Sequence, residues 1–133
     1  MKLNFSLHAA ILALASLVAV PQAAKAVPED YEFRLVESEI KQGDGATVSV
    51  RLIDKRSGNP VADAVVFATR MDMEPDGMET MTTQVEAVPS DEAGVYRFKT
   101  NLVMAGGWRF SIAAKVQGEA ETIESRLVFK VVE

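Results

Sequence analysis

The sequence predicts an all-β fold, an immunoglobulin-like antiparallel β-sandwich of about seven strands. Three observations support this prediction. After the first 26 residues, several segments alternate apolar and polar side chains with the period of two that is typical of half-buried strands. Turns rich in glycine and proline separate these segments at intervals of about 10 to 15 residues, as in β-sandwiches. No segment after residue 26 repeats apolar residues every 3.6 positions, so no α-helix is expected.

The strands can be placed in order along the chain. Residues 31–37 and 46–54 alternate most clearly, whereas residues 61–69 form a more continuous apolar run that predicts a strand in the middle of a sheet. The other strands are expected at residues 82–88, 95–100, 106–116 and 122–132. The disulfide and strand-C tryptophan of antibody domains are missing, so "immunoglobulin-like" describes the architecture alone.

The first 26 residues are typical of a secretory signal peptide. Lys2 is followed by an apolar run over residues 9–20 and by a small-x-small pattern that ends at Ala26. The run is broken by Pro21 and is shorter than the about 20 apolar residues that a membrane span requires. We therefore expect cleavage after Ala26, a periplasmic location, no membrane insertion after signal removal, and one domain over residues 27–133.

Composition excludes several classes of function. The formal net charge of −5 becomes −7 when Lys2 and Lys25 leave with the signal peptide, which disfavours nucleic acid as a partner. The chain has no cysteine, and its only histidine, His8, lies in the signal peptide. This composition excludes thiol and histidine nucleophiles, Ser-His-Asp triads and conventional zinc sites after residue 26. We therefore expect a protein that is not an enzyme.

The most unusual stretch is residues 71–81, which holds four of the six methionines: Met71, Met73, Met78 and Met81. Acidic residues lie between them, and Pro75-Asp76-Gly77 predicts a turn in the middle. If Pro75 and Asp76 form a tight turn, Met71, Met73 and Met78 share one face; if Gly77 joins the loop as a bulge, Met71, Met73 and Met81 do. Three neutral thioethers suit Cu(I) or Ag(I), and they need no deprotonation to bind.

Other interpretations of this stretch remain open. Methionine commonly fills gaps in a core, and an exposed methionine-rich patch can serve as an adaptable surface for a protein partner. The acids between Asp72 and Asp76 imitate the start of a calcium loop, but Thr83 stands where the closing glutamate belongs. The carboxylates are better interpreted as a solvated face that attracts cations, and nothing places them in a catalytic cleft.

A second motif is Met104-Ala-Gly-Gly-Trp108. Gly106 and Gly107 allow a close approach at the start of a strand, and Trp108 has the size of a core anchor. In the functional interpretation, Met104 adds a sulfur ligand and Trp108 covers a bound Cu(I). The sequence does not show whether this motif reaches the methionine stretch.

Together these features resemble the YtkA-like/FixH family. The resemblance rests on residues 58–65, on Met71-x-Met73, on Gly94-Val-Tyr96 and on the Met104 to Trp108 motif, and it covers residues 45 to 130. It implies a small exported β-sandwich associated with copper or heavy-metal handling, beside efflux systems or cytochrome oxidase assembly. The histidine often found near the family's methionines is missing here.

From these features we expect a non-enzymatic periplasmic accessory protein that binds or relays Cu(I) or Ag(I). The candidate ligands are Met71, Met73, Met78, Met81 and Met104, with Trp108 beside them. The alternative is a metal-free interaction module that docks on an efflux or assembly complex.

Overall fold

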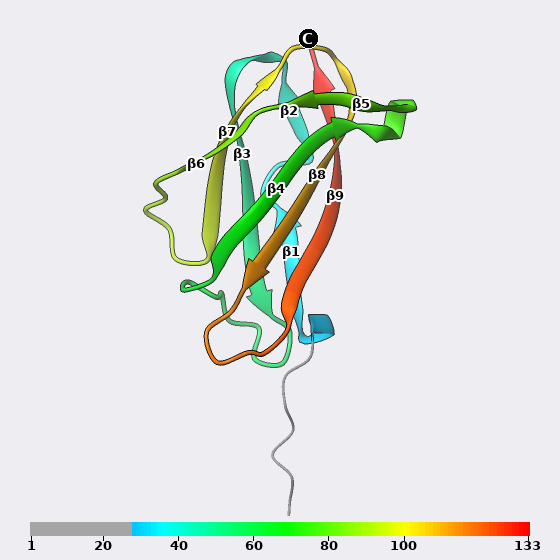
Figure 1. Ribbon diagram of the computed structural model, residues 1–133. Coiled ribbons are helices and arrows are strands. Elements are labelled where there is room, and N and C mark those ends of the chain that lie inside the picture. The colour runs from blue at the N-terminus through cyan, green and yellow to red at the C-terminus, as the bar shows by residue number, and fades with distance from the viewer. Residues whose placement is uncertain (1–27) are drawn as a thin grey trace, which may run out of the picture.

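The computed structural model describes residues 28–133, so the predicted signal peptide lies outside the described residues. In this range the chain forms nine strands in two sheets that pack face to face, which confirms the predicted all-β sandwich (Figure 1). A 3-10 turn, η1 (Pro28–Asp30), precedes the first strand, and no α-helix is present in the described residues.

One sheet has four strands in the order β1-β3-β7-β6. They are β1 (Tyr31–Leu35), β3 (Gly43–Asp54), β7 (Val95–Leu102) and β6 (Val85–Val88). All neighbours in this sheet are antiparallel. Val48, Val50 and Leu52 alternate along β3 and are fully buried, as the period-2 pattern of that segment predicts.

The other sheet has five strands in the order β2-β9-β8-β4-β5. They are β2 (Glu39–Lys41), β9 (Thr122–Val132), β8 (Gly106–Lys115), β4 (Val65–Met73) and β5 (Met78–Thr83). The sequence analysis missed β2, which pairs parallel to the end of β9. Three residues with one buried side chain, Ile40, are too few to show a recognisable alternation.

The strand expected at residues 61–69 begins later and ends later than predicted. Val61 lies in the preceding loop, where its carbonyl accepts a 2.7 Å hydrogen bond from the Tyr96 hydroxyl, and β4 runs on to Met73. A bulge between Val66 and Ala68 interrupts the pairing of β4 with β8. Strand β4 lies between β8 and β5, which confirms the predicted position in the middle of a sheet, but its first half exposes Val65 and Phe67.

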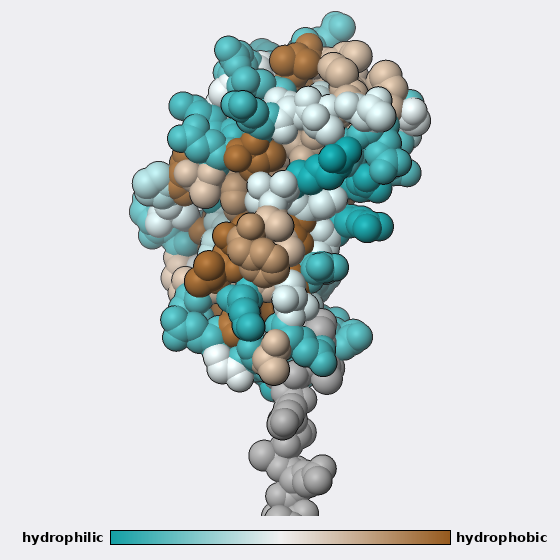
Figure 2. Space-filling view, in the orientation of Figure 1, coloured by the Kyte–Doolittle hydropathy of each residue, from teal (hydrophilic) through white to brown (hydrophobic). Residues whose placement is uncertain are grey.

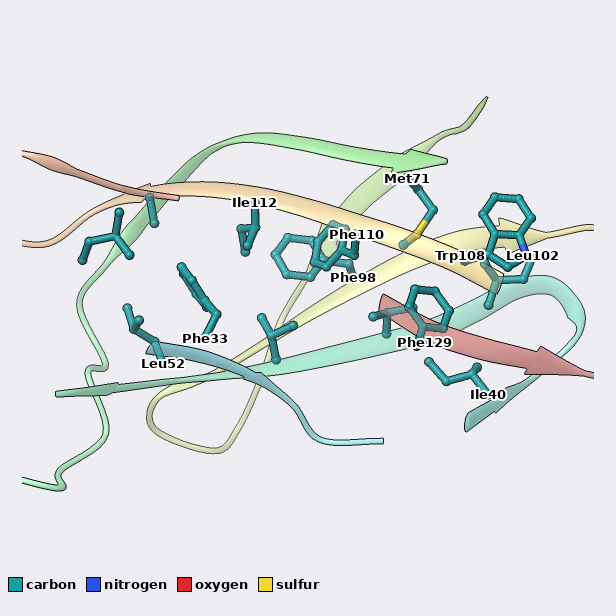
Figure 3. Close-up of a cluster of buried hydrophobic side chains, with 14 of the residues drawn as sticks. Phe33, Ile40, Leu52, Met71, Phe98, Leu102, Trp108, Phe110, Ile112 and Phe129 are labelled. Carbon is teal, nitrogen blue, oxygen red and sulfur yellow. The ribbon is translucent and has the colours of Figure 1, made fainter. Parts of the chain in front are cut away.

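The core fills the space between the sheets. Phe98 on β7 and Phe110 on β8 meet there edge to face, with ring centroids 5.1 Å apart. Figure 3 shows Met71 pointing into the same core, between Phe110 and Trp108. Trp108 is fully buried, as expected of a core anchor.

Candidate functional site

The methionine stretch forms a hairpin at the end of the sandwich where the chain ends (Figure 1). Strands β4 and β5 are joined by a 3-10 turn, η2 (Glu74–Asp76), and by Gly77, whose φ of 74° places it in the left-handed region. Pro75 suits the first turn of such a helix because its fixed φ is helical, and Gly77 adopts positive φ without a steric cost. The turn predicted at Pro75-Asp76-Gly77 is therefore present.

The hairpin register combines the two alternatives derived from the sequence. Met73 lies opposite Met78, as in the tight turn, but the register then shifts so that Asp72 lies opposite Thr82 and Met71 opposite Thr83. Met71 and Met73 are fully buried, Met81 is half-buried against the core, and Met78 is 37% exposed. The inner side of the hairpin thus presents Met71, Met73 and Met81, and Met78 lies at the surface.

The Met104 motif reaches the hairpin, a point that the sequence left open. The backbone N–H of Gly107 donates a 3.1 Å hydrogen bond to Asp76 Oδ2, so the start of β8 lies against η2. A Cβ atom on Gly106 would lie 3.2 Å from the methyl carbon of Met73. The Trp108 Nε1–H donates a 2.9 Å hydrogen bond to the carbonyl of Met104, whose side chain packs against the core. Both methionine motifs therefore belong to one end of the sandwich.

Asp72 points away from the thioethers, onto the outer face of the five-stranded sheet. Its carboxylate is fully buried and accepts 3.0 Å hydrogen bonds from Arg109 and Arg70 and a 2.9 Å bond from the Glu74 N–H. Burial raises the pKa of Asp72, but the hydrogen bonds from Arg109, Glu74 and Arg70 outweigh it and hold the pKa below its ordinary value. No local pattern in the sequence indicates this buried ion pair, because Asp72 is one of several acids in a hairpin that was predicted to be solvated.

The side chains that distinguish the hairpin end are neutral thioethers. In residues 28–133 no group of three or more His, Cys, Asp or Glu side chains is arranged to hold a metal ion, so the hairpin acids do not form a carboxylate cage. Asp72 is bound by its two arginines, and Asp76 by the Gly107 N–H. Thioethers beside an indole suit a soft monovalent cation and suit hard cations poorly.

A separate surface feature lies on the first half of β4. Val65 is 61% exposed and Phe67 is 59% exposed, and they line a shallow apolar hollow of about 480 Å³ together with residues 115–119. Figure 2 shows these apolar side chains as a brown patch in a largely hydrophilic face. The sequence analysis missed this patch because it placed the whole segment inside the sheet.

Fold and site together define a small immunoglobulin-like β-sandwich with a methionine-rich hairpin. The chain belongs to the YtkA-like family, whose family model matches residues 25–113. No curated protein matches the chain. No helix within residues 28–133 has the length and apolar character needed to cross a membrane.

Three solved structures show low similarity to the chain. The filamin domain of Lin-41 is 17% identical, with a TM-score of 0.47 over 75% of this chain and 91% of that domain. The C-terminal domain of ZirS is 14% identical, with a TM-score of 0.45 over 100% of this chain and 94% of that one. A conjugative transposon lipoprotein from Bacteroides eggerthii is 12% identical, with a TM-score of 0.35 over 75% of this chain and 96% of that one.

Proposed function

We propose that this protein is a non-enzymatic periplasmic accessory protein that binds or relays a soft metal ion, Cu(I) or Ag(I), at its methionine hairpin. Membership of the YtkA-like family supports an accessory role, and a metal efflux or oxidase assembly system is the expected context. The observation that carries the proposal is the convergence of two methionine motifs, through Asp76, Gly106 and Gly107, at one end of the sandwich.

Within the candidate set we assign different roles to the methionines. Met73 lies against Gly106 at the junction between the hairpin and β8, Met81 and Met104 pack against the core as further candidate ligands, and Met78 lies at the surface where an ion would arrive. Met71 pairs with Phe110 across β4 and β8 and points into the core. We therefore assign it a role in packing rather than in binding the ion. Trp108 is fully buried and is bonded to the Met104 carbonyl, and we assign it the role of an apolar side chain beside the Met104 segment. A thioether set of this kind binds without proton release, so affinity should change little between pH 5 and pH 7.

The test is a titration of the exported protein with Cu(I) or Ag(I) against a competing chelator. We expect one ion per protein for the wild type and loss of stoichiometric binding when Met73, Met78, Met81 and Met104 are all changed to leucine. Leucine approximates the volume of methionine, so the variant should stay folded. The matched control is Met71→Leu, which removes a sulfur from the core and should keep the affinity. Failure of the wild type to bind, or an equal loss in the control, would contradict the proposal.

A second candidate function is a metal-free interaction module that docks on an efflux or assembly complex. The exposed pair Val65 and Phe67 favours it, because adjacent apolar side chains on an otherwise charged surface are typical of protein contacts. A Phe67→Ser variant separates the two functions. If docking through this patch is the function, the variant loses binding to the complex and keeps any affinity for Cu(I); if metal relay alone is the function, neither changes.

A further inference from the structure

Two side-chain contacts hold the turn of the methionine hairpin on β8. Arg109 lies 3.7 Å from Glu74 at the start of η2, and Asp76 at the end of η2 contacts the Gly107 backbone. Asp76 Oδ2 accepts the 3.1 Å hydrogen bond from the Gly107 N–H, a contact between residues 31 positions apart. Both groups are near solvent, and the bond joins a charged acceptor to a backbone donor. At Pro75 and Asp76, the contact therefore ties a surface turn to a core strand through one exposed hydrogen bond.

The two glycines of β8 make this contact possible. A Cβ atom on Gly107 would lie 2.9 Å from Pro75 Cβ and 3.0 Å from Asp76 Oδ1, and one on Gly106 would overlap the Asp76 carboxylate. Gly106 also has a φ of 136°, which other residues rarely adopt. The two glycines thus form a surface without side chains, the glycine seat, against which η2 packs directly.

Met73 is the side chain that η2 covers when it packs on these two glycines. It immediately precedes η2, is fully buried, and has its methyl carbon next to Gly106. On the other side of Met73 the hairpin is anchored independently, because the buried Asp72 carboxylate binds Arg109 and Arg70. Movement of Pro75 and Asp76 would therefore uncover Met73 while Glu74, whose N–H is bonded to Asp72, and Met71 remain in place.

We propose that Asp76 is a positioning residue that closes η2 over Met73 and controls the access of small ligands to this thioether. In the cell, the small ligand that reaches Met73 is the soft metal ion, and this assignment rests on the proposed function. Opening breaks the Asp76 to Gly107 hydrogen bond and lifts Pro75 and Asp76 from the glycine seat. Closing restores the contact and returns Met73 to the apolar environment of Trp108.

The closure can be tested without metal by following methionine oxidation. The exported protein is treated with dilute hydrogen peroxide, and the sulfoxide at each methionine is quantified over time by peptide mass spectrometry. Met78 is exposed and should react fastest in every variant. In Asp76→Ala we expect Met73 to oxidise about fivefold to tenfold faster than in the wild type, the factor that loss of one exposed hydrogen bond predicts. Met71 should be unchanged, because it lies behind the Asp72 anchor.

Three further variants make the result specific. Gly107→Ala keeps the carboxylate but places a Cβ under Pro75 and Asp76, so it should also accelerate the oxidation of Met73. Asp76→Asn keeps an oxygen acceptor and should restore the wild-type rate at Met73. Glu79→Gln removes a charge from the same hairpin without touching Gly107 and should leave Met73 unchanged.

Two outcomes would overturn the proposal. One is an unchanged rate at Met73 in both Asp76→Ala and Gly107→Ala. The other is an equal acceleration at Met71 and Met73, which reports general unfolding. The rate of Ag(I) association, measured in parallel, should rise in the same two variants. A wild type that binds no Ag(I) while Met73 responds as expected would overturn the proposed function and support the closure.

Discussion

Asp72 on β4 carries a fully buried carboxylate. It stands between two buried methionines, yet its side chain points to the opposite face and is buried by Arg109 and Arg70. Arg109 is itself mostly covered, with 16% of its side chain exposed, and it also lies 3.7 Å from Glu74. The hydrogen bond to Asp72 raises the pKa of Arg109, so both Asp72 and Arg109 remain charged.

The pair should make a measurable contribution to stability. We expect Asp72→Asn to lower the free energy of unfolding by about 2 kcal/mol, because hydrogen bonds to a charged group contribute about 1.5 to 3 kcal/mol and the amide keeps the shape. Urea denaturation followed by circular dichroism measures the change. Glu79→Gln is the control and should stay within about 0.5 kcal/mol of the wild type. A difference no larger than that of the control would contradict the assigned role.

The same pair predicts how the effect depends on pH. The folded protein holds the pKa of Asp72 below its ordinary value, which is about 3.9 in an unfolded chain. Ionised Asp72 therefore stabilises the fold above about pH 4, and this contribution is lost as pH falls through the lowered pKa. The stability difference between the wild type and Asp72→Asn should be constant from pH 7 to pH 5 and should shrink below pH 4. A constant difference down to pH 2.5 would contradict the assignment.

At the scale of elements, the loop before β4 is fixed against the turn that precedes β7. The Leu52 N–H donates a 2.9 Å hydrogen bond to the Gly94 carbonyl, and Val61 N–H donates to Leu52 O at 2.9 Å. Gly94 has a φ of 78°, and a Cβ atom there would overlap Pro60. This packing explains why β4 begins only at Val65, since the preceding residues belong to a loop that crosses the end of the sandwich.

Gly94→Ala should therefore destabilise the protein more than an ordinary loop substitution. Gly118 is a matched control, because its φ of 83° is similar but a Cβ atom there meets open space. We expect Gly118→Ala to cost about 1 kcal/mol for the left-handed conformation alone, and Gly94→Ala to cost about 2 to 3 kcal/mol. Thermal unfolding of both variants measures the difference. Equal losses of stability in the two variants would mean that the contact of the added Cβ atom with Pro60 does not contribute to the destabilisation of Gly94→Ala.

At the scale of the whole molecule, the two sheets are joined by aromatic and aliphatic side chains without a disulfide. Phe98 and Phe110 come from different sheets and are 2% and 0% exposed. Their edge-to-face contact at 5.1 Å is one of the places where both sheets meet through large side chains. A domain without cysteine depends on such contacts for its stability.

A double-mutant cycle tests this contact. Phe98→Leu and Phe110→Leu should each destabilise the protein, and the double variant should lose about 1 kcal/mol less than the sum of the two, the coupling expected for an aromatic pair. Guanidinium denaturation of the four proteins gives the coupling energy. Strict additivity would show that the two rings contribute independently and that the sheets are held together elsewhere.

The sequence predicted the architecture because alternation and turn chemistry are local signals. Strands β3, β7, β8 and β9 bury alternate apolar residues, so a period of two could be recognised in each. Strand β2 and the bulge in β4 were missed because both depend on partners distant in the chain, β9 and β8 respectively. The turn of the methionine hairpin was predicted from Pro75 and Gly77, but its register shift was not.

What the sequence by itself determined is the set of chemical groups: thioethers with no cysteine and, after residue 26, no histidine, and a turn that folds them back on one another. Only the tertiary structure decided which methionines are buried, that the Met104 motif touches the hairpin, and that Asp72 binds two arginines on the outer face. The physical reason is that side-chain identity is local, whereas burial depends on which strands pair. A one-residue change in register moves every side chain of a strand to the other face of its sheet.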